Sequence, residues 1–321
     1  MPKFKVIYDT DPGVDDAMAL LLLARHPDIE LKAITTVFGN GGIDVVTRNA
    51  LFLKEKFGVT APVARGASAG FGAPPAPASV AVHGANGLGG YPVTEPVGKE
   101  DPRVAAQLIV ELVRAHPGEI DIVAVGRMTN LALALALDPG IAKLVRGVSV
   151  MGGAFGRNGH FGNVTPVAEA NIFGDALAAD IVFGAEWRMV IVPLDATHES
   201  VMTDAYIGEL RDKTGADGQF LWDVSREYAK HYGSRGFAGF PVHDSSAVAA
   251  LMHPEMFGYE LGPVRVVTAE GVAHGQTVLK PEGSSHWRAS GYDGRPVCKV
   301  ATKVDAPAFL QFYRDSIVGG R

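Results

Sequence analysis

The sequence predicts an α/β protein with a doubly wound, mainly parallel open sheet that is flanked by helices. Short apolar runs alternate along the chain with amphipathic segments of helical length, and this β-α-β rhythm is typical of parallel sheets. The apolar runs are hydrophobic at most positions, as expected for strands that helices cover on both faces. In such a fold the ligand binds at the carboxyl ends of the strands, so we expect the functional residues there.

The expected elements follow one another in a regular order. Strands are predicted at residues 4–8, 31–37, 120–125, 148–151 and 188–192. Helices are predicted between and after them, at residues 15–25, 43–57, 102–115, 130–137 and 175–183. The later elements are a mostly helical stretch, strands at one edge of the sheet, and a last helix, at residues 205–252, at 264–278 and 299–304, and at 307–317. We expect all of them to form a single domain, residues 1–321.

Residues 66–92 interrupt this pattern, because they are too rich in Gly, Pro and Ala to form a core element. A loop of this length inside a compact domain usually acts as a lid or a binding loop. A flexible insertion without a role is the alternative.

Composition excludes several classes of partner and site. The 35 acidic and 29 basic residues give a net charge of −6 without a basic block, which argues against nucleic acid or an anionic membrane as a partner. Cys298 is the only cysteine, which excludes an internal disulfide and a cysteine-rich metal site. No signal segment is visible at the N-terminus, and no apolar run reaches the ~20 residues that span a bilayer. These features predict a cytoplasmic protein.

Four aspartates crowd the point where the first strand leads into the first helix: Asp9, Asp11, Asp15 and Asp16. Two carboxylates ~4 Å apart repel by roughly 4 kcal/mol at an effective dielectric near 20, so a cation or protons must offset the charge. The alternative is that acidic residues merely favour a helix N-terminus, which would account for Asp15 and Asp16 but not for Asp9 and Asp11. Because the zinc-binding patterns of Cys and His are missing, oxygen ligands favour Ca²⁺ or Mg²⁺.

Two later segments supply further polar residues. His243 and Asp244 directly precede an expected helix, where Asp244 alone would be interpreted as an N-cap and His243 as a surface residue. Glu169 and Asn171 are two residues apart and Asn163 lies nearby, and together they offer donors and acceptors suited to sugar hydroxyl groups.

Eight segments of the chain resemble, in order, the signatures of the nucleoside hydrolases: "DTDPGVDDAMAL", "ITTVFGN", "HGANGLGG", "VAVGRMTNLALAL", "MGGA", "GNVTPVAEANI", "PLDATH" and "VHDSSAVA". The resemblance runs from Val6 to about Met252. It implies an enzyme that converts a nucleoside and water to a free base and ribose, and relatives in that family suggest a homodimer or homotetramer.

The resemblance also implies a role for each matching residue. A bound Ca²⁺ would be held by Asp11, Asp16, Asp244 and the main-chain carbonyl of Thr129. Asp11 would act as general base on the metal-bound water, and His243, a residue type that titrates near neutrality, would protonate the leaving base. The other residues implied to bind substrate are Asp15, Asn40, Asn163, Glu169 and Asn171 at the ribose, and His83, Met151 and Tyr232, with Tyr228, His231 and Phe237 as further candidates near Tyr232.

The chain departs from the family pattern at two positions near the expected site. Arg127 stands where Pro is more common, and an arginine beside a cation site is expected only if it points away. Ala170 stands where some relatives have a bulky aromatic residue, which is expected to loosen the pocket around the 5′ end of the sugar.

Two other functions are compatible with parts of this pattern. A Mg²⁺-dependent phosphatase of the haloacid dehalogenase type also begins with a strand and an Asp-x-Asp pair, here Asp9 and Asp11, and Asp180 imitates its later acidic motif. A non-catalytic ribose- or nucleoside-binding protein would use the same acidic pocket, but it would be expected to have lost Asp11 or a metal ligand. The preference for purine or pyrimidine bases stays open, and the histidine pattern leans toward an inosine–uridine-like range.

Overall fold

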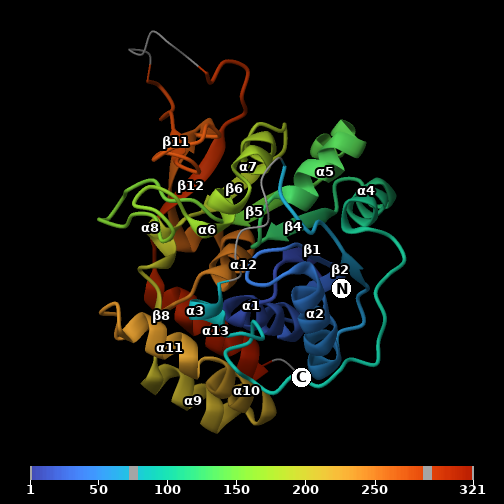
Figure 1. The fold of residues 1–321 in the computed structure, drawn as a ribbon, viewed down its shortest axis with the longest axis vertical. Helices are drawn as coiled ribbons and strands as arrows, with labels where there is room; N and C mark the ends of the chain where they lie inside the picture. The colour runs from blue at the N-terminus through green and yellow to red at the C-terminus, as the bar shows by residue number, and fades with distance from the viewer. Residues whose placement is uncertain (1, 72–78, 285–290, 320–321) are drawn as a thin grey trace.

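One central sheet organises the part of the chain that the computed structural model describes, residues 2–71, 79–284 and 291–319 (Figure 1). Eight strands of the described residues lie in the order β3 (Val63–Arg65), β2 (Ile29–Thr36), β1 (Phe4–Thr10), β4 (Ile120–Ala124), β5 (Gly147–Met151), β6 (Met189–Val192), β12 (Cys298–Val304) and β9 (Phe257–Gly262). All neighbours are parallel except β9, which pairs antiparallel with β12. The predicted doubly wound, mainly parallel sheet is therefore confirmed.

Helices cover both faces of the sheet. Successive side chains of each strand point to opposite faces, and because the central strands are apolar at most positions, both faces must be buried. Val6 and Tyr8 of β1 belong to one hydrophobic core, and Ile7 between them belongs to the other. The first core includes α1 (Val14–Arg25), α2 (Ile43–Phe57), α12 (Asp244–Met252) and α13 (Ala306–Gly319). The second includes α4 (Ala105–Ala115), α5 (Thr129–Leu137) and α7 (Ala176–Phe183).

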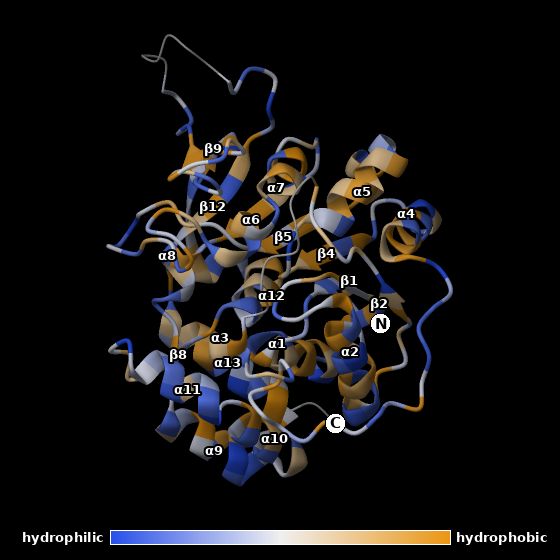
Figure 2. Cartoon of the chain, in the orientation of Figure 1, coloured by the Kyte–Doolittle hydropathy of each residue, from blue (hydrophilic) through white to orange (hydrophobic). Residues whose placement is uncertain are grey.

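A further group of helices extends the first core, and the last of the three also supplies residues to the site. It consists of α9 (Asp204–Thr214), α10 (Ala216–Val224) and α11 (Arg226–Gly233). Figure 2 shows that the strands of the central sheet are mostly hydrophobic, whereas α11 carries many hydrophilic residues. The remaining short elements are α3 (Val80–His83), α6 (Ala170–Gly174), α8 (Leu194–Thr197), the 3₁₀ turns η1 (Pro139–Lys143) and η2 (Pro254–Met256), and two antiparallel hairpins, β7 (Val201–Thr203) with β8 (Gly239–Pro241) and β10 (Val264–Val266) with β11 (Thr277–Leu279).

The predicted strands and helices of the first two thirds of the chain are confirmed to within about three residues at each end, but the far edge of the sheet differs. Residues 264–278 were predicted to add a strand at the sheet edge, and this prediction is wrong. They contribute instead to the separate β10–β11 hairpin. Strand β12 lies one position inside the edge, and the edge itself is β9, which the sequence did not predict. The reason is that β9 is only partly buried and mixes polar with apolar residues, so it lacks the continuous apolar run of a central strand.

Of the loop at residues 66–92, residues 72–78 lie outside the described part of the chain. The rest contains α3, which ends at His83 and packs near α11. Among the described residues, no helix combines the length and the apolar character that crossing a bilayer requires.

We predict that Phe183→Ala lowers the free energy of unfolding by about 3–5 kcal/mol, because it deletes a large side chain that is 0% exposed in the second core. The control is Leu177→Ala in the same helix, where the side chain is 45% exposed and the expected loss is under about 1 kcal/mol. Urea unfolding followed by circular dichroism measures both. Equal losses for the two variants would contradict the packing of α7 against the sheet.

Candidate active site

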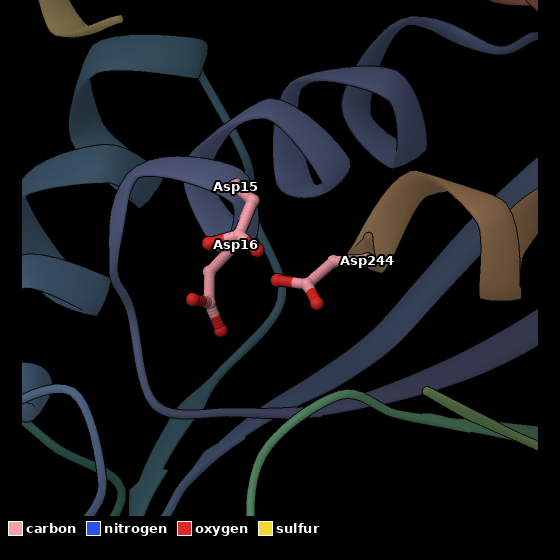
Figure 3. Close-up of side chains that lie close together, drawn as sticks. All are labelled: Asp15, Asp16 and Asp244. Carbon is pink, nitrogen blue, oxygen red and sulfur yellow. The ribbon is translucent and has the colours of Figure 1, made fainter. Parts of the chain in front are cut away.

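Three buried aspartates from the starts of two helices lie together at the carboxyl edge of the sheet. Asp15 and Asp16 belong to the first turn of α1, which follows β1, and Asp244 is the first residue of α12. One carboxylate oxygen of each lies within 4.8 Å of the others, and the three side chains gather at one point (Figure 3). None of the three is more than 8% exposed, so water screens their repulsion poorly.

Asp16 also stabilises the local backbone. Its carboxylate accepts hydrogen bonds from the backbone N–H of Gly13 at 2.8 Å and from the side chain of Asn40 at 2.9 Å. The N-terminus of α1 therefore explains the position of Asp16 in part, as the alternative interpretation expected. Capping does not explain Asp244, because α12 has no side-chain cap hydrogen bond at its start.

Asp11 and Asp15 each have one buried oxygen, Oδ1, without a hydrogen-bond partner among the described residues. The other oxygen of Asp11 accepts from the backbone N–H of Asn40 at 2.8 Å, and that of Asp15 accepts from the Tyr228 hydroxyl at 3.2 Å. Burial, reinforced by neighbouring carboxylates, raises the pKa of Asp11 and Asp244 well above the usual range. Burial also raises the pKa of Asp15 to about 6. A set of oxygen donors with unused capacity fits a hard divalent cation, so the cluster can hold a metal ion.

Asp9 has a different environment from the other aspartates of its segment. Its Oδ1 accepts hydrogen bonds from the Thr35 hydroxyl at 2.6 Å and from the Asn130 side chain at 2.8 Å. Burial raises the pKa of Asp9 to about 7. Asp9 therefore ties β1 to β2 and α5 beneath the site.

A pocket opens onto the cluster, and most of the predicted substrate-binding residues line it. Its lining includes Asp15, Asn40, His83, Met151, Asn163, Glu169, Asn171, Tyr232, His243 and Asp244. Asp11, Asp16 and Thr129 are predicted site residues that do not belong to this lining. The Thr129 side chain turns elsewhere, since its hydroxyl donates to Asp175 Oδ2 at 2.7 Å.

The predicted sugar-binding residues are held in place by the backbone around them. Glu169 caps α6 and accepts hydrogen bonds from the backbone N–H groups of Asn171 at 2.9 Å and Gly153 at 3.0 Å. The Asn171 side chain donates to the carbonyl of Val125 at 2.7 Å, and Asn163 Oδ1 accepts from the backbone at the start of α6 at 3.0 Å. These contacts fix a polar wall on one side of the pocket.

His243, which also lines the pocket, belongs to a chain of hydrogen bonds. Its Nδ1 lies 2.8 Å from the Thr197 hydroxyl, and its Nε2 lies 2.8 Å from the hydroxyl of Tyr232. The hydroxyls of Tyr232 and Tyr228 interact, and Tyr228 donates to Asp15. Burial lowers the pKa of His243 well below its usual range, which favours the neutral imidazole.

His83 is also neutral. Its Nδ1 accepts a hydrogen bond from the backbone N–H of Val14 at 3.2 Å, which requires an unprotonated nitrogen. Burial lowers the pKa of His83 to about 4. The 3.8 Å approach of its Nδ1 to Asp15 Oδ1 is therefore not an ion pair at pH 7.

Some residues of the site were missed or named only as further candidates. Tyr228 and His231 line the pocket, as the resemblance suggested for their region. Thr197 was not predicted, although it lies in the motif "PLDATH", because only the fold brings it to His243.

Asp180, the later acidic residue that the phosphatase alternative would need, forms ion pairs with Arg265 and Arg295.

Known proteins resemble this chain over nearly its whole length. The family described as inosine-uridine preferring nucleoside hydrolase matches residues 6–311. The probable uridine nucleosidase 1 of Oryza sativa subsp. japonica is 40% identical over 318 residues, which cover 98% of this chain and 96% of the relative. The inosine-uridine preferring nucleoside hydrolase of Crithidia fasciculata is 39% identical over 283 residues, 87% of this chain and 88% of the relative. A solved plant nucleoside hydrolase superposes with a TM-score of 0.94 at 34% identity, over 99% of each chain.

We predict that Asp15→Asn makes the metal-free protein more stable than the wild type at pH values above about 6. The folded-state pKa of Asp15 lies above its ordinary value of 3.8, so the proton stabilises the fold and this stability is lost as the pH rises through about 6. The difference in the free energy of unfolding should reach about 3 kcal/mol at high pH and shrink toward pH 4.

Urea unfolding with a chelator present, at several pH values, measures this difference. Asp212→Asn removes a carboxylate that is 67% exposed and should show no such pH dependence. A stability difference between Asp15→Asn and the wild type that stays constant from pH 4 to pH 8 would refute the prediction.

Proposed function

The chain belongs to the inosine-uridine preferring nucleoside hydrolase family and is a nucleoside hydrolase, and from this premise we propose how its residues cleave the N-glycosidic bond of a ribonucleoside. The observation that carries the proposal is the acidic cluster at the carboxyl edge of the sheet, which opens into a pocket that also contains Tyr232 and His243. As the glycosidic bond breaks, the sugar becomes an oxocarbenium-like cation, and buried carboxylates stabilise such a charge.

The proposed metal ion is Ca²⁺, held by Asp11, Asp16, Asp244 and the main-chain carbonyl of Thr129. Asp16 and Asp244 belong to the cluster whose oxygens lie within 4.8 Å of one another, and the buried Oδ1 of Asp11 has no hydrogen-bond partner among the described residues; both observations support this assignment. When bound, Ca²⁺ would polarise the attacking water and orient the ribose diol.

Asp11 is the proposed general base. Its Oδ2 is occupied by the backbone N–H of Asn40, whereas its Oδ1 has no partner among the described residues and is available to take a proton from the attacking water. A carboxyl whose pKa is raised accepts that proton at lower cost than an ordinary carboxylate.

Asp15 is the proposed partner of a ribose hydroxyl, because it lines the pocket and its Oδ1 is unpartnered among the described residues. The polar wall would bind the remaining hydroxyl groups. The residues proposed for this role, with Met151 packing beside them, are Asn40, Asn163, Glu169 and Asn171.

His243 and Tyr232 form the proposed relay that delivers a proton to the departing base. In the proposed step one proton moves from the hydrogen-bonded Tyr232–His243 pair to the departing base while Asp11 takes one from the attacking water, and exchange with solvent after product release restores both groups. Tyr228 connects this relay to Asp15, and His83 lies on the same side of the pocket.

We also infer that the chain works as a single domain, since the sheet takes strands from β1 near the N-terminus to β12 near the C-terminus. The homodimer or homotetramer and the cytoplasmic location stay predictions.

The chain retains Asp11 and every proposed metal ligand, which disfavours the alternative of a protein that binds nucleosides without cleaving them.

A panel of uridine, inosine, adenosine and cytidine, assayed for released ribose with a chelator and after adding back Ca²⁺, tests the proposed function. Uridine and inosine are expected to be substrates, since the names of the relatives include both, and activity should disappear with the chelator and return with Ca²⁺. Failure of every ribonucleoside to release ribose with Ca²⁺ present would reject it.

We predict that Asp11→Asn lowers kcat by about 10²–10⁴-fold, because the variant loses the general base. Calorimetric Ca²⁺ binding to the same variant separates this effect from loss of a metal ligand. Asp212→Asn, exposed and remote, should keep wild-type kcat. If Asp11→Asn retains kcat within a few-fold of the wild type, another group must be the base.

We predict that His243→Ala slows inosine about 10²-fold but barely changes the cleavage of p-nitrophenyl riboside, whose leaving group needs no proton. Steady-state kinetics with both substrates measures the contrast, and the activated substrate serves as the control for folding. Equal slowing of the two substrates would remove His243 from leaving-group protonation.

A further inference from the structure

Thr197 lies next to His243 but does not belong to the lining of the pocket. It is the last residue of α8, its side chain is 0% exposed, and its Oγ1 lies 2.8 Å from His243 Nδ1. The other ring nitrogen, Nε2, lies 2.8 Å from the hydroxyl of Tyr232. Because both nitrogens face an oxygen at hydrogen-bond distance, the orientation of the ring is fixed, and the remaining question is which nitrogen carries the proton.

The hydrogen bonds of Thr197 determine which nitrogen that is. Its hydroxyl has no partner other than His243 Nδ1 among the described residues. The buried hydroxyl of Ser246 donates to the backbone carbonyl four residues earlier at 2.6 Å, but the carbonyl four residues before Thr197, that of Pro193, accepts from backbone N–H groups instead. A buried O–H without an acceptor is costly, so the Thr197 hydroxyl donates to Nδ1.

This bond sets the direction of the next one along the chain of hydrogen bonds. A ring nitrogen that accepts a hydrogen bond carries no proton, so the imidazole proton is on Nε2 and is donated to the oxygen of Tyr232. Tyr232 lines the pocket, and its own proton is thereby left for an acceptor there. In the opposite tautomer, Nε2 of His243 would accept the proton of Tyr232 and withhold it from a ligand.

We propose that Thr197 is a positioning residue, which holds His243 as the Nε2–H tautomer and so keeps the proton of Tyr232 available to the departing base. The inference rests on the proposed function, because it needs a reaction in which a base leaves with a proton.

The proposed step moves one proton. The O–H bond of Tyr232 breaks, an N–H bond forms on the base, and the electron pair of the O–H bond stays on the Tyr232 oxygen. Burial raises the pKa of Tyr232, which opposes this step, whereas the hydrogen bond from His243 Nε2–H stabilises the negative oxygen and favours it. Solvent returns the proton after product release.

Thr197→Val tests the proposal, because it keeps the shape of the side chain and removes the hydroxyl. With inosine, kcat should fall about tenfold while KM changes less than about threefold, since Thr197 does not line the pocket. Cleavage of p-nitrophenyl riboside, whose leaving group needs no proton, should stay within about twofold of the wild type. Thr197→Ser restores the hydroxyl and should recover most of the rate with inosine.

Thr47→Val is the matched control. Thr47 belongs to α2, is also 0% exposed, and its hydroxyl lies 2.8 Å from that of another buried threonine, Thr36. This variant also removes a buried side-chain hydrogen bond, so it should lose stability in urea unfolding, but it should keep wild-type kcat with inosine.

The tautomer itself is measured by ¹⁵N NMR of the wild type labelled at histidine, with the His243 signals identified by their loss in His243→Gln. We expect the proton on Nε2 in the wild type and a shift of the proton toward Nδ1 in Thr197→Val. A wild-type proton on Nδ1 would overturn the proposal whatever the kinetics of the variants. Equal slowing of inosine and p-nitrophenyl riboside by Thr197→Val, or unchanged kcat with inosine, would also overturn it.

Failure of the wild type to release ribose from any ribonucleoside would instead overturn the proposed function. The NMR result does not depend on turnover, so the two failures are distinguishable.

Discussion

Repulsion among buried carboxylates is the constraint on which the rest of this site depends. Asp11, Asp15 and Asp16 come from the end of β1 and the start of α1, and Asp244 comes from α12, yet all are nearly excluded from water. At an effective dielectric of ~20, each pair of charges ~4 Å apart costs roughly 4 kcal/mol. Protons, a cation or a neighbouring positive charge must offset this energy. Burial raises the pKa of Asp11, Asp15 and Asp244, and the neighbouring carboxylates raise the pKa of Asp11 and Asp244 further.

The architecture makes this concentration of charge possible. Parallel strands end at one edge, and the helices that follow them present unpaired N–H groups to that edge, where negative charge is favoured. Asp16 has both roles: its side chain caps the N-terminus of α1, and its carboxylate belongs to the acidic cluster. Asn40 links Asp11 to Asp16 through its backbone and its side chain, so the end of β2 fixes the spacing of charges from β1 and α1.

The sequence predicted the centre of the molecule better than its edges, for physical reasons. Central strands read as continuous apolar runs, whereas β9 at the edge is mixed in composition and β3 has only three residues. The aspartates were recognisable as a candidate cation site because like charges at a strand end need an explanation. The contact of Thr197 with His243, the lowered pKa of His243 and the burial of Arg127 depend on packing between distant segments, which no local pattern encodes.

The central claim is that protons and Ca²⁺ compete for the same buried carboxylates, and the proton balance of Ca²⁺ binding tests it most directly. Burial raises the pKa of the proposed ligands Asp11 and Asp244, so the measurement is calorimetric titration of the metal-free protein at several pH values, repeated in buffers of different ionisation enthalpy. The account predicts one Ca²⁺ per chain and net release of protons on binding. Binding without proton release, or no binding at all, would contradict it.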